Sequence, residues 1–589
     1  MPILSPALRN KNNRGTPKNL PLRGHRDAWG LLGLGAGLLA ANPLFAGGYG
    51  LAAAGGAASA LGGWLVGHPR GERRFSVLDS KSREGFTLES DAPYLDDGLL
   101  LGYTKDGNLP VRVPWSRVMY HLGFIGSSGF GKTTVGLYAL AQQMALGGGF
   151  IFIDAKIDVD TRDTLGYLSR LYGRESELMV LNVDNPDDSN TYNPILYGDA
   201  DEISSRLLNL IPSAETNPGA DHYRQSANHA LAALVGGLQA TNYLWDFNDL
   251  TVLTQSAAAL EDVIRRVPPG PERMSMEIFV DKYRRFDRQQ GAVVDINKMK
   301  DTLGGLSGRM ALFAQGKFGQ IFNTYAPEVN LYDIIVNNKM LYVMLPTMGK
   351  NTQALNFAKM LLSDLMSAVA MVQGLPKKQR PWPPFLVFAD EMGSYPMEGI
   401  ARLFEQARSA NIAMMPGFQS FANLKVVSED FADMVTQSMY TKLFFHFGAK
   451  DSAEMAAEII GKEKKMQYSV TNNQSEGASE RFLQAAPDSS ESETGAVGES
   501  WREAEEYRVA PDKLTALVPG ESVALIGSRL YHMVTPRITT PIDSAESGSD
   551  ERKALDFHPL HFRTQIPDGK RGLDFAKTYG KYLQASQDF

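Results

Sequence analysis

The segment from Gly126 to Thr134 constrains the fold more than any other part of this sequence. It contains the pattern Gly-x-x-x-x-Gly-Lys-Thr. Glycines permit a tight loop whose backbone N–H groups surround phosphates, while the lysine and the hydroxyl group reach the terminal phosphates and Mg²⁺. The apolar run 118–125 predicts a strand before the loop, and the periodicity of 135–143 predicts a helix whose N-terminus points at the phosphates. This context identifies a Walker A motif, or P-loop, in an α/β domain.

The expected cofactors are ATP and Mg²⁺. Within the loop, Lys132 is expected to reach the β- and γ-phosphates, and Thr133 to bind the metal. The full set of expected nucleotide-binding residues is Gly126, Ser127, Ser128, Gly129, Phe130, Gly131, Lys132, Thr133 and Thr134.

A second motif supplies the acidic groups that such a site needs. The apolar run from Pro384 to Ala389 ends in Asp390 and Glu391, which is the Walker B pattern. We expect Asp390 to orient the shell of the metal and Glu391 to polarise the attacking water. A strand that ends in Asp-Glu is common by itself, so this assignment depends on its pairing with the Walker A motif.

Other short apolar runs predict the remaining strands of a parallel sheet buried on both faces. They are 149–154, 178–183, 340–345, 412–418 and 442–447, followed by a closing hairpin over 522–534. Asp154 and Lys156 follow the first of these strands, at the edge where ligands gather in open α/β sheets. The pattern is typical of a P-loop NTPase of the RecA type.

Two polar residues after the Walker B motif are candidates for the chemistry. Gln419 follows the strand 412–418 and could sense the γ-phosphate, the alternative being a surface glutamine. Arg408 could be supplied to a neighbouring subunit, since a guanidinium stabilises charge on the transferred phosphoryl group. A surface arginine is the equally open alternative.

The N-terminal region predicts a membrane anchor. Residues 28–67 contain no Asp, Glu, Lys or Arg and are divided by Asn42-Pro43, so they form two arms of about the length that spans a bilayer. Basic residues flank both arms, which places both termini in the cytoplasm. A flexible Ala/Gly-rich linker is the alternative for this stretch.

Composition narrows the remaining function classes. The chain has 589 residues, a net charge of −7 and no cysteine. The absence of cysteine excludes disulfides, thiol nucleophiles and Cys-based zinc sites. The negative charge argues against a basic coat over the whole chain, so any contact with nucleic acid must be local.

The order of these motifs resembles that of type IV coupling proteins of the TraG/TraD class. The resemblance is carried by the two-span hairpin, both Walker motifs, Asp154-x-Lys156, residues 192–194, residues 407–409 and the segment 417–420. Residues 147–158 are similar to the branch that serves I-type plasmids and the Dot/Icm system. The resemblance implies a homohexameric ATPase in the bacterial inner membrane, with channel proteins and either a relaxase with single-stranded DNA or effector proteins and chaperones as partners.

The resemblance and the composition together divide the chain. The expected parts are a basic N-terminus (1–27), a transmembrane hairpin (28–67), a nucleotide-binding domain in two pieces (70–197 and 331–537), an all-α insertion (198–330), an acidic loop (472–507) and a flexible tail (538–589). In the insertion, basic residues between Lys282 and Lys317 outnumber acidic ones, and Tyr283 and Phe286 lie among them. This segment is either a surface that follows a phosphate backbone or an ordinary solvated helix face.

Three functions fit this organisation. The leading one is an ATPase that couples a DNA–relaxase complex or an effector protein to a type IV secretion channel. The alternatives are a FtsK/HerA-like translocase on double-stranded DNA, and a nucleotide-binding docking platform with little turnover. The fold does not choose between DNA and protein as cargo.

Overall fold

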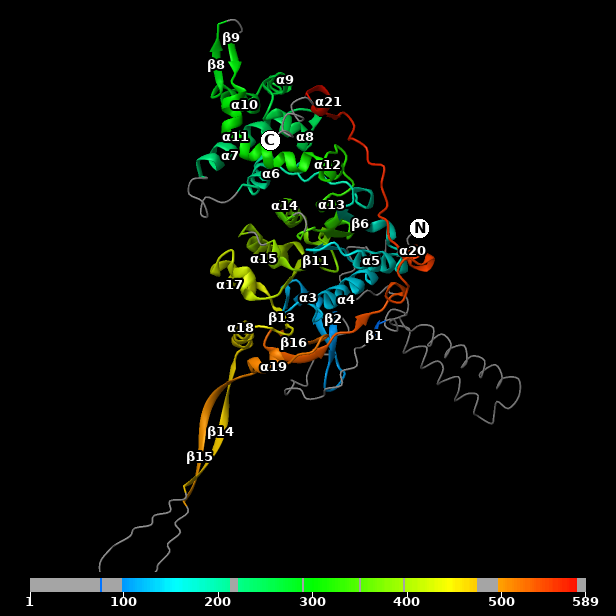
Figure 1. Ribbon diagram of the computed structural model, residues 1–589, viewed down its shortest axis with the longest axis vertical. Coiled ribbons are helices and arrows are strands. Elements are labelled where there is room, and N and C mark those ends of the chain that lie inside the picture. The colour runs from blue at the N-terminus through cyan, green and yellow to red at the C-terminus, as the bar shows by residue number, and fades with distance from the viewer. Residues whose placement is uncertain are drawn as a thin grey trace, which may run out of the picture.

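The structure is a computed structural model, and it describes residues 75–76, 98–211, 221–288, 291–348, 351–395, 398–473 and 496–579. The predicted basic N-terminus and transmembrane hairpin lie outside the described residues. Figure 1 shows a sheet in the middle of the molecule, a helical domain at one end and a long ribbon at the other.

An 11-stranded sheet forms the centre, in the order β3-β2-β17-β16-β13-β4-β12-β11-β5-β10-β6. The strands from β13 to β6 in this order run parallel, as expected. They are β13 (Thr441–Phe444), β4 (Leu122–Ile125), β12 (Ile412–Phe418), β11 (Phe385–Ala389), β5 (Phe150–Asp154), β10 (Met340–Met344) and β6 (Leu178–Asn182). All but β13 are buried along their whole length, which explains their continuous apolar sequences.

Antiparallel strands extend one edge of this sheet. The predicted closing hairpin is present as β16 (Glu521–Ile526) and β17 (Arg529–Val534). A second hairpin, β2 (Gly98–Thr104) and β3 (Pro110–Pro114), lies beyond it and was not expected. The strand expected over 118–125 begins only at Leu122, because Trp115–Val118 forms the short helix α3.

Alternate side chains of each strand enter two separate cores. On one face, Phe152 and Phe388 pack with α4 (Lys132–Ala145) and α5 (Val159–Leu171). On the other face, Ile153 and Val387 pack with α14 (Asn351–Gly374) and α15 (Ala401–Gln406). Within the described residues, one helix has the length and hydropathy of a membrane span, Thr352–Gly374 of α14, and 67 % of its apolar window is buried in the protein.

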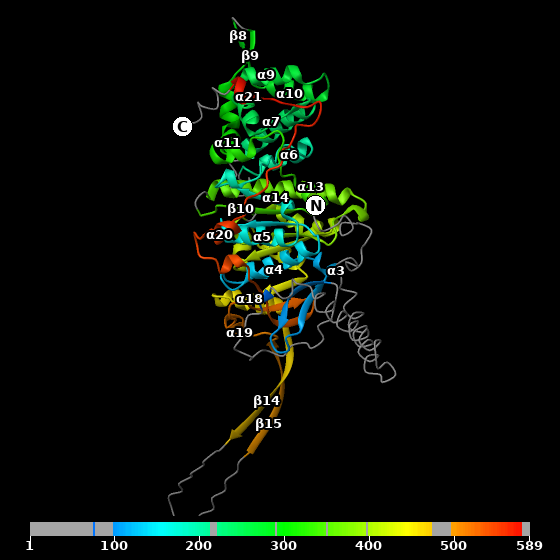
Figure 2. The same cartoon turned by 90° about the vertical axis from the view of Figure 1, so that its right-hand side faces the viewer.

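Four further helices complete this second face, and the last two of them lie toward the ribbon end of the molecule (Figures 1 and 2). They are α16 (Phe421–Lys425), α17 (Glu429–Ser438), α18 (Lys450–Ile460) and α19 (Pro511–Thr515).

The predicted insertion is largely helical and stands on the α14 side of the sheet (Figure 2). Its helices are α6 (Ala200–Leu208), α7 (Asp221–Gln239), α8 (Phe247–Leu253), α9 (Ala257–Arg266), α10 (Pro271–Asp281), α11 (Ile296–Ala314) and α12 (Gly316–Phe322), and α13 (Leu331–Val336) leads back to the sheet. The all-α expectation is wrong at β7 (Tyr243–Leu244) and at the hairpin of β8 (Arg284–Asp287) and β9 (Gly291–Val294). Gly291 has φ +78°, a conformation that favours a turn over a helix.

The expected acidic loop, 472–507, is described only at its two ends, and both of these ends are strands. Residues 496–507 form β15 (Ala496–Tyr507), which pairs antiparallel with β14 (Lys462–Asn473) from Lys462↔Tyr507 to Asn473↔Ala496. At the base of this ribbon, the Lys462 ammonium lies 4.9 Å from the centre of the Tyr507 ring. The ribbon projects away from the body of the protein (Figures 1 and 2).

The tail expected to be flexible instead lies along the body of the protein, over residues 538–579. After α20 (Asp550–Leu555), the ring of Phe557 is buried against Gly166 of α5, where a Cβ would lie 2.3 Å from that ring. The backbone N–H groups of Phe557 and Phe562 donate to Asp163 and Glu328, at 3.0 and 2.6 Å. The sequence did not predict this course, because its anchors are far apart along the chain.

The tail ends in the helical domain. β19 (Arg571–Gly572) pairs in parallel with β7, and α21 (Phe575–Tyr579) packs on α8. The Phe575 ring is buried, and its backbone N–H donates to Asp249 Oδ1 at 3.0 Å. His558 and His561 contact Asp188 (2.7 Å) and Glu328 (3.4 Å) along this path.

We predict that Phe575→Ala releases the end of the tail. Removing a buried phenylalanine costs about 3–5 kcal/mol, and here that loss falls on a short segment. Hydrogen exchange of residues 571–579 should accelerate strongly. Phe562→Ala, in the same tail but with a ring 39 % exposed, is the control and should change exchange little. Unchanged exchange in Phe575→Ala would contradict the docking of the tail.

Candidate nucleotide-binding site

The P-loop connects β4 to α4 at the carboxyl edge of the parallel strands. Gly126, Gly129 and Gly131 all have positive φ, of +148°, +83° and +108°. Non-glycine residues rarely adopt such angles. Lys132 is buried at the start of α4, and its ammonium group donates to the carbonyls of Gly126 (2.6 Å) and Ser127 (3.2 Å). Burial lowers the pKa of this lysine, and the nearby Glu391 and Asp390 oppose that shift.

Two loop residues hold the P-loop against the segment after β13. The Ser127 hydroxyl accepts from the Gly448 N–H at 3.0 Å, and the Phe130 ring stacks on His446 with centroids 4.0 Å apart. These side chains therefore support the loop rather than face the cavity beside it.

The strand order brings the two Walker motifs together across an intervening strand. β12 lies between β4 and β11, and the hydroxyl of Thr133 donates to Asp390 Oδ2 at 2.5 Å across its end. This contact passes beside Gly417, where a Cβ would lie 2.9 Å from Asp390 Oδ1. A glycine at the end of β12 is therefore needed to leave room for the Asp390 carboxylate.

Glu391 lies between the lysine and the glutamine that the sequence singled out. One carboxylate oxygen is 3.8 Å from the Lys132 ammonium, and the other accepts from the Gln419 amide at 3.0 Å. Glu391 has φ +50°, a left-handed conformation that is uncommon outside glycine and asparagine and that occurs at functional sites. The structure thus assembles Lys132, Thr133, Asp390, Glu391 and Gln419 at one edge of the sheet, as the sequence predicts.

A further acidic group lies one strand away. Asp154 ends β5 fully buried, accepts from the Tyr342 hydroxyl at 3.1 Å and from the Lys156 N–H at 3.2 Å. Burial, reinforced by the charge of Asp390, raises the pKa of Asp154 to about 7. The Tyr395 hydroxyl donates to the Asp390 carbonyl at 2.9 Å, which supports the turn between the two acids of the Walker B motif.

A cavity of about 570 Å³ opens beside the P-loop. Its predicted lining residues are Ser128, Gly129, Gly131, Lys132, Thr133, Thr134, Lys156 and Glu391. Residues that sequence reasoning missed are Asp160, Thr161 and Thr164 from α5, and Pro519, Gly520, Arg537, Ile538 and Asp543 from the closing hairpin and the tail. No local motif marks the latter group, since the fold alone brings them to the loop.

Arg408 lies away from this cavity. It belongs to the 3₁₀ turn Ala407–Ala410 that precedes β12, so it lies at the amino edge of the sheet, opposite the P-loop of its own chain. Its guanidinium stacks on Tyr120, 3.6 Å from the ring centre, and Arg117 lies 5.5 Å from the same ring. The predicted role toward a neighbouring subunit therefore remains a prediction.

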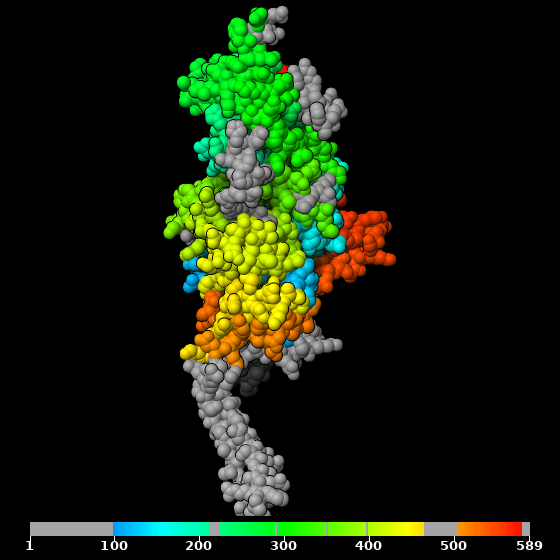
Figure 3. Space-filling model, turned by 60° about the vertical axis from the view of Figure 1, so that its left-hand side comes forward, coloured from blue at the N-terminus to red at the C-terminus, as the bar shows by residue number. Residues whose placement is uncertain are grey.

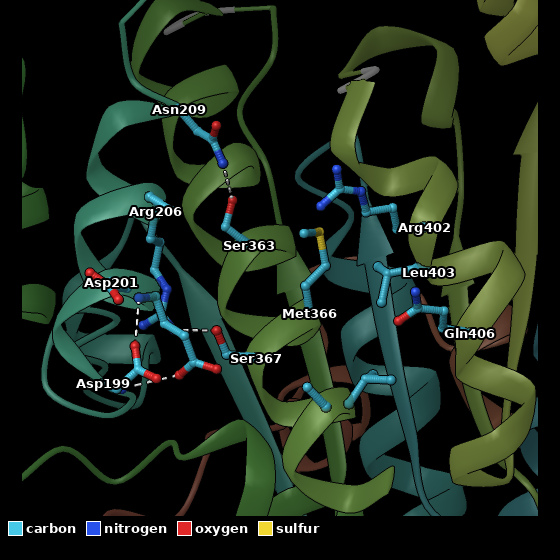
Figure 4. Close-up of a pocket in the computed structure, with 14 residues that line it drawn as sticks. Asp199, Asp201, Arg206, Asn209, Ser363, Met366, Ser367, Arg402, Leu403 and Gln406 are labelled. Carbon is cyan, nitrogen blue, oxygen red and sulfur yellow. Dashed lines mark hydrogen bonds between the residues drawn. The ribbon is translucent and has the colours of Figure 1, made fainter. Parts of the chain in front are cut away.

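A second cavity, of about 400 Å³, lies between α6, α14 and α15 (Figure 4). On its α6 side, the buried Arg206 pairs with Asp364 at 2.9 Å and donates to Ser367 at 3.0 Å. Arg402 and Gln406 line the α15 side (Figure 4). This cavity lies between the helical domain and the helices α14 and α15 that cover the sheet, and it shares no residue with the cavity at the P-loop.

Comparisons with known proteins agree with this architecture. The unbound bacterial conjugative coupling protein TrwB has a TM-score of 0.52 at 13 % sequence identity, over 79 % of this chain and 93 % of that one. The plasmid coupling protein TrwB in complex with ADP and Mg²⁺ has a TM-score of 0.50 at 13 % identity, over 79 % and 94 % of the two chains. The fold is therefore a mixed α/β fold with a large parallel sheet, and it resembles the RecA-like fold of TrwB.

Sequence comparisons add to this likeness in fold. A family model described as the TraM recognition site of TraD and TraG matches residues 384–508. The type 4 coupling protein DotL of Legionella pneumophila is 24 % identical over 355 residues, which is 52 % of this chain and 45 % of that relative. The match thus spans less than half of the relative's length. Together with the fold, these findings confirm the resemblance of the chain to type IV coupling proteins.

The raised pKa of Asp154 predicts an unusual dependence of stability on pH. Between about pH 4 and 7 the folded protein keeps a proton on this carboxyl that the unfolded chain releases. Stability therefore falls as pH rises through this window, by about 1.4 kcal/mol per pH unit at most. Asp154→Asn removes the effect, so the variant should melt above wild type at pH 8, with a gap that narrows toward pH 4. Asp106→Asn, at an exposed position, should show no such trend.

A gap between Asp154→Asn and wild type that stays constant across this pH range, in thermal melts without nucleotide, would contradict the assignment.

Proposed function

We propose that this chain is a membrane-anchored ATPase that couples a macromolecular substrate to a type IV secretion channel. The observation that carries the proposal is the contact of Thr133 with Asp390 at 2.5 Å beside Glu391. This pairing joins the groups that hold a nucleotide phosphate with those that activate water. The TrwB structure with ADP and Mg²⁺ supports the choice of ligands.

The residues of the site have distinct roles in this proposal. Lys132 and the loop N–H groups bind the phosphates, and Thr133 and Asp390 would hold Mg²⁺, whose charge assists phosphoryl transfer when it is bound. Glu391 accepts the proton of the attacking water. Gln419 orients Glu391 through the 3.0 Å hydrogen bond, which deepens the sensing role that the sequence suggested.

The setting of this ATPase is part of the same proposal. We place it in the bacterial inner membrane, with the hairpin 28–67 as a two-span anchor, both termini in the cytoplasm and a homohexamer as the working assembly. Its partners are the channel proteins and either a relaxase with single-stranded DNA or effector proteins with their chaperones. The match of residues 384–508 to a TraM recognition model supports a relaxosome-type partner.

Glu391→Gln should abolish turnover without abolishing binding. The amide keeps the size of the side chain but cannot accept a proton, so ATP hydrolysis by the full chain in detergent should fall about 10²- to 10⁴-fold. Lys132→Ala should lose both hydrolysis and nucleotide affinity, because the phosphates lose their main cation. Glu405→Gln, at an exposed position, is the matched control.

These measurements also separate the open alternatives. Negligible wild-type turnover with intact nucleotide binding would favour the docking platform. Stimulation of turnover by double-stranded but not by single-stranded DNA would favour the translocase. Wild-type turnover in Lys132→Ala would refute the proposed site.

Arg408 should act on the nucleotide of a neighbouring subunit. Arg408→Ala is expected to lower turnover about 10³-fold, the size of effect that an arginine finger produces. Mixing this variant with Lys132→Ala should restore part of the activity, since some interfaces then combine an intact Arg408 with an intact P-loop. Arg117→Ala, which removes the other cation on Tyr120, is the control. If Arg408 only stacks on Tyr120, both variants will behave alike.

A further inference from the structure

The hairpin β8–β9 projects from the helical domain at the end farthest from the sheet (Figures 1 and 2), and it belongs to the green end of the space-filling view (Figure 3). Only its base is packed. Tyr283 is buried against Phe279, with ring centroids 5.4 Å apart, and its carbonyl accepts from the Asp295 N–H at 2.8 Å. Val294 is also buried. The base is thus fixed, and the two strands extend beyond it into solvent.

Phe286 lies on the extended part with its side chain 82 % exposed. The residue opposite it in the ladder is Ala292, which is too small to cover an aromatic ring. Arg284 is two residues away on the same strand and so lies on the same face. The sequence grouped Tyr283 with Phe286, but the structure separates them, since Tyr283 belongs to the core and Phe286 is available to a ligand.

Basic residues lie along the first strand of the hairpin and at its base. Arg284 pairs with Asp281 (2.5 Å) and Arg285 pairs with Asp295 (3.9 Å), and their side chains remain 35 % and 66 % exposed. Lys282 and Arg288, which flank the first strand, are exposed as well. Lys298 of α11 donates to the Lys282 carbonyl at 3.2 Å, which brings a further ammonium group to the base of the hairpin.

We propose that the β8–β9 hairpin is a contact site for single-stranded nucleic acid, in which Phe286 stacks on a base and Arg284 and Arg288, two residues before and after it, contact phosphates. Aromatic rings among basic side chains bind single strands in this way. Every base has a flat face that can stack on a ring, and every phosphodiester group carries a negative charge. An acidic peptide would match the charge equally well. A ring that stands on a two-stranded arm, opposite an alanine, forms no pocket for a peptide side chain, whereas stacking needs only its open face.

This inference rests on the proposed function, whose substrate class it names, but binding can be measured without nucleotide. The full chain in detergent is titrated into a labelled 20-nucleotide oligo-dT, and fluorescence anisotropy reports affinity. Phe286→Ala should weaken binding about 5- to 150-fold, the range expected for one stacked base. Phe286→Trp should retain it, since indole also stacks. Because the ring is exposed, neither change threatens the fold.

Two further variants test the contribution of phosphate contacts separately from that of stacking. Arg284→Ala and Arg288→Ala should each lower the slope of log affinity against log salt by about 0.7, as expected for one phosphate contact to a single strand. Ile278→Ala, on α10 and also exposed, removes an apolar side chain outside the hairpin and should leave oligo-dT binding unchanged.

The proposal is overturned if Phe286→Ala binds oligo-dT as wild type does, or if the wild-type chain does not bind it. It is also overturned if Phe286→Ala weakens binding of a 20-residue poly-glutamate peptide but not of oligo-dT, because the hairpin is then a protein contact. None of these outcomes depends on ATP hydrolysis, so they leave the Lys132 and Glu391 tests of the proposed function untouched.

Discussion

The candidate site depends on one strand placed between two others. Because β12 separates β4 from β11, the P-loop and the Walker B acids approach each other over the end of a neighbour rather than side by side. Gly417 leaves the space that Asp390 needs, and Gln419, two residues later, reaches Glu391. This strand order thus sets the distance between Thr133 and Asp390, and the end of β12 also supplies the partner of Glu391.

The opposite edge of the sheet is fixed by buried polar groups. Arg174 donates to the carbonyls of Gly148 (2.6 Å) and Asn338 (2.6 Å), which precede β5 and β10, and pairs with Glu177. His121 accepts from the Met414 N–H at 3.0 Å and bonds the Phe404 carbonyl at 2.6 Å, and burial lowers its pKa to about 4. An uncharged imidazole suits this position, because one nitrogen accepts while the other donates. These buried hydrogen bonds hold the amino edge of the sheet together, whereas the carboxyl edge is open to a ligand.

Local sequence predicted the buried parallel strands and the residues that follow them, because continuous apolar runs and phosphate-loop glycines report directly on their surroundings. It could not predict what distant contacts decide. Arg537 and Asp543 reach the cavity only through the closing hairpin, and Phe557 and Phe575 find their positions only in the folded protein. Tyr283 and Phe286 show the same limit, since two aromatic residues in one basic run differ in burial solely through the packing of α10 and the hairpin base.

The course of the tail has a mechanical consequence. The helical domain is connected to the sheet where the chain leaves β6 and where it returns to β10, and the tail adds a third tether. That tether begins at Arg537 and Asp543 in the wall of the cavity at the P-loop and ends at the pairing of β19 with β7. Two chain connections alone would allow the helical domain to rotate about the line that joins them. A third connection away from that line resists this rotation. A tilt of the helical domain must either part β19 from β7 or pull on the tail at Phe557, which is anchored on α5. Because α5 also lines the cavity at the P-loop, strain in the helical domain reaches the wall of that cavity.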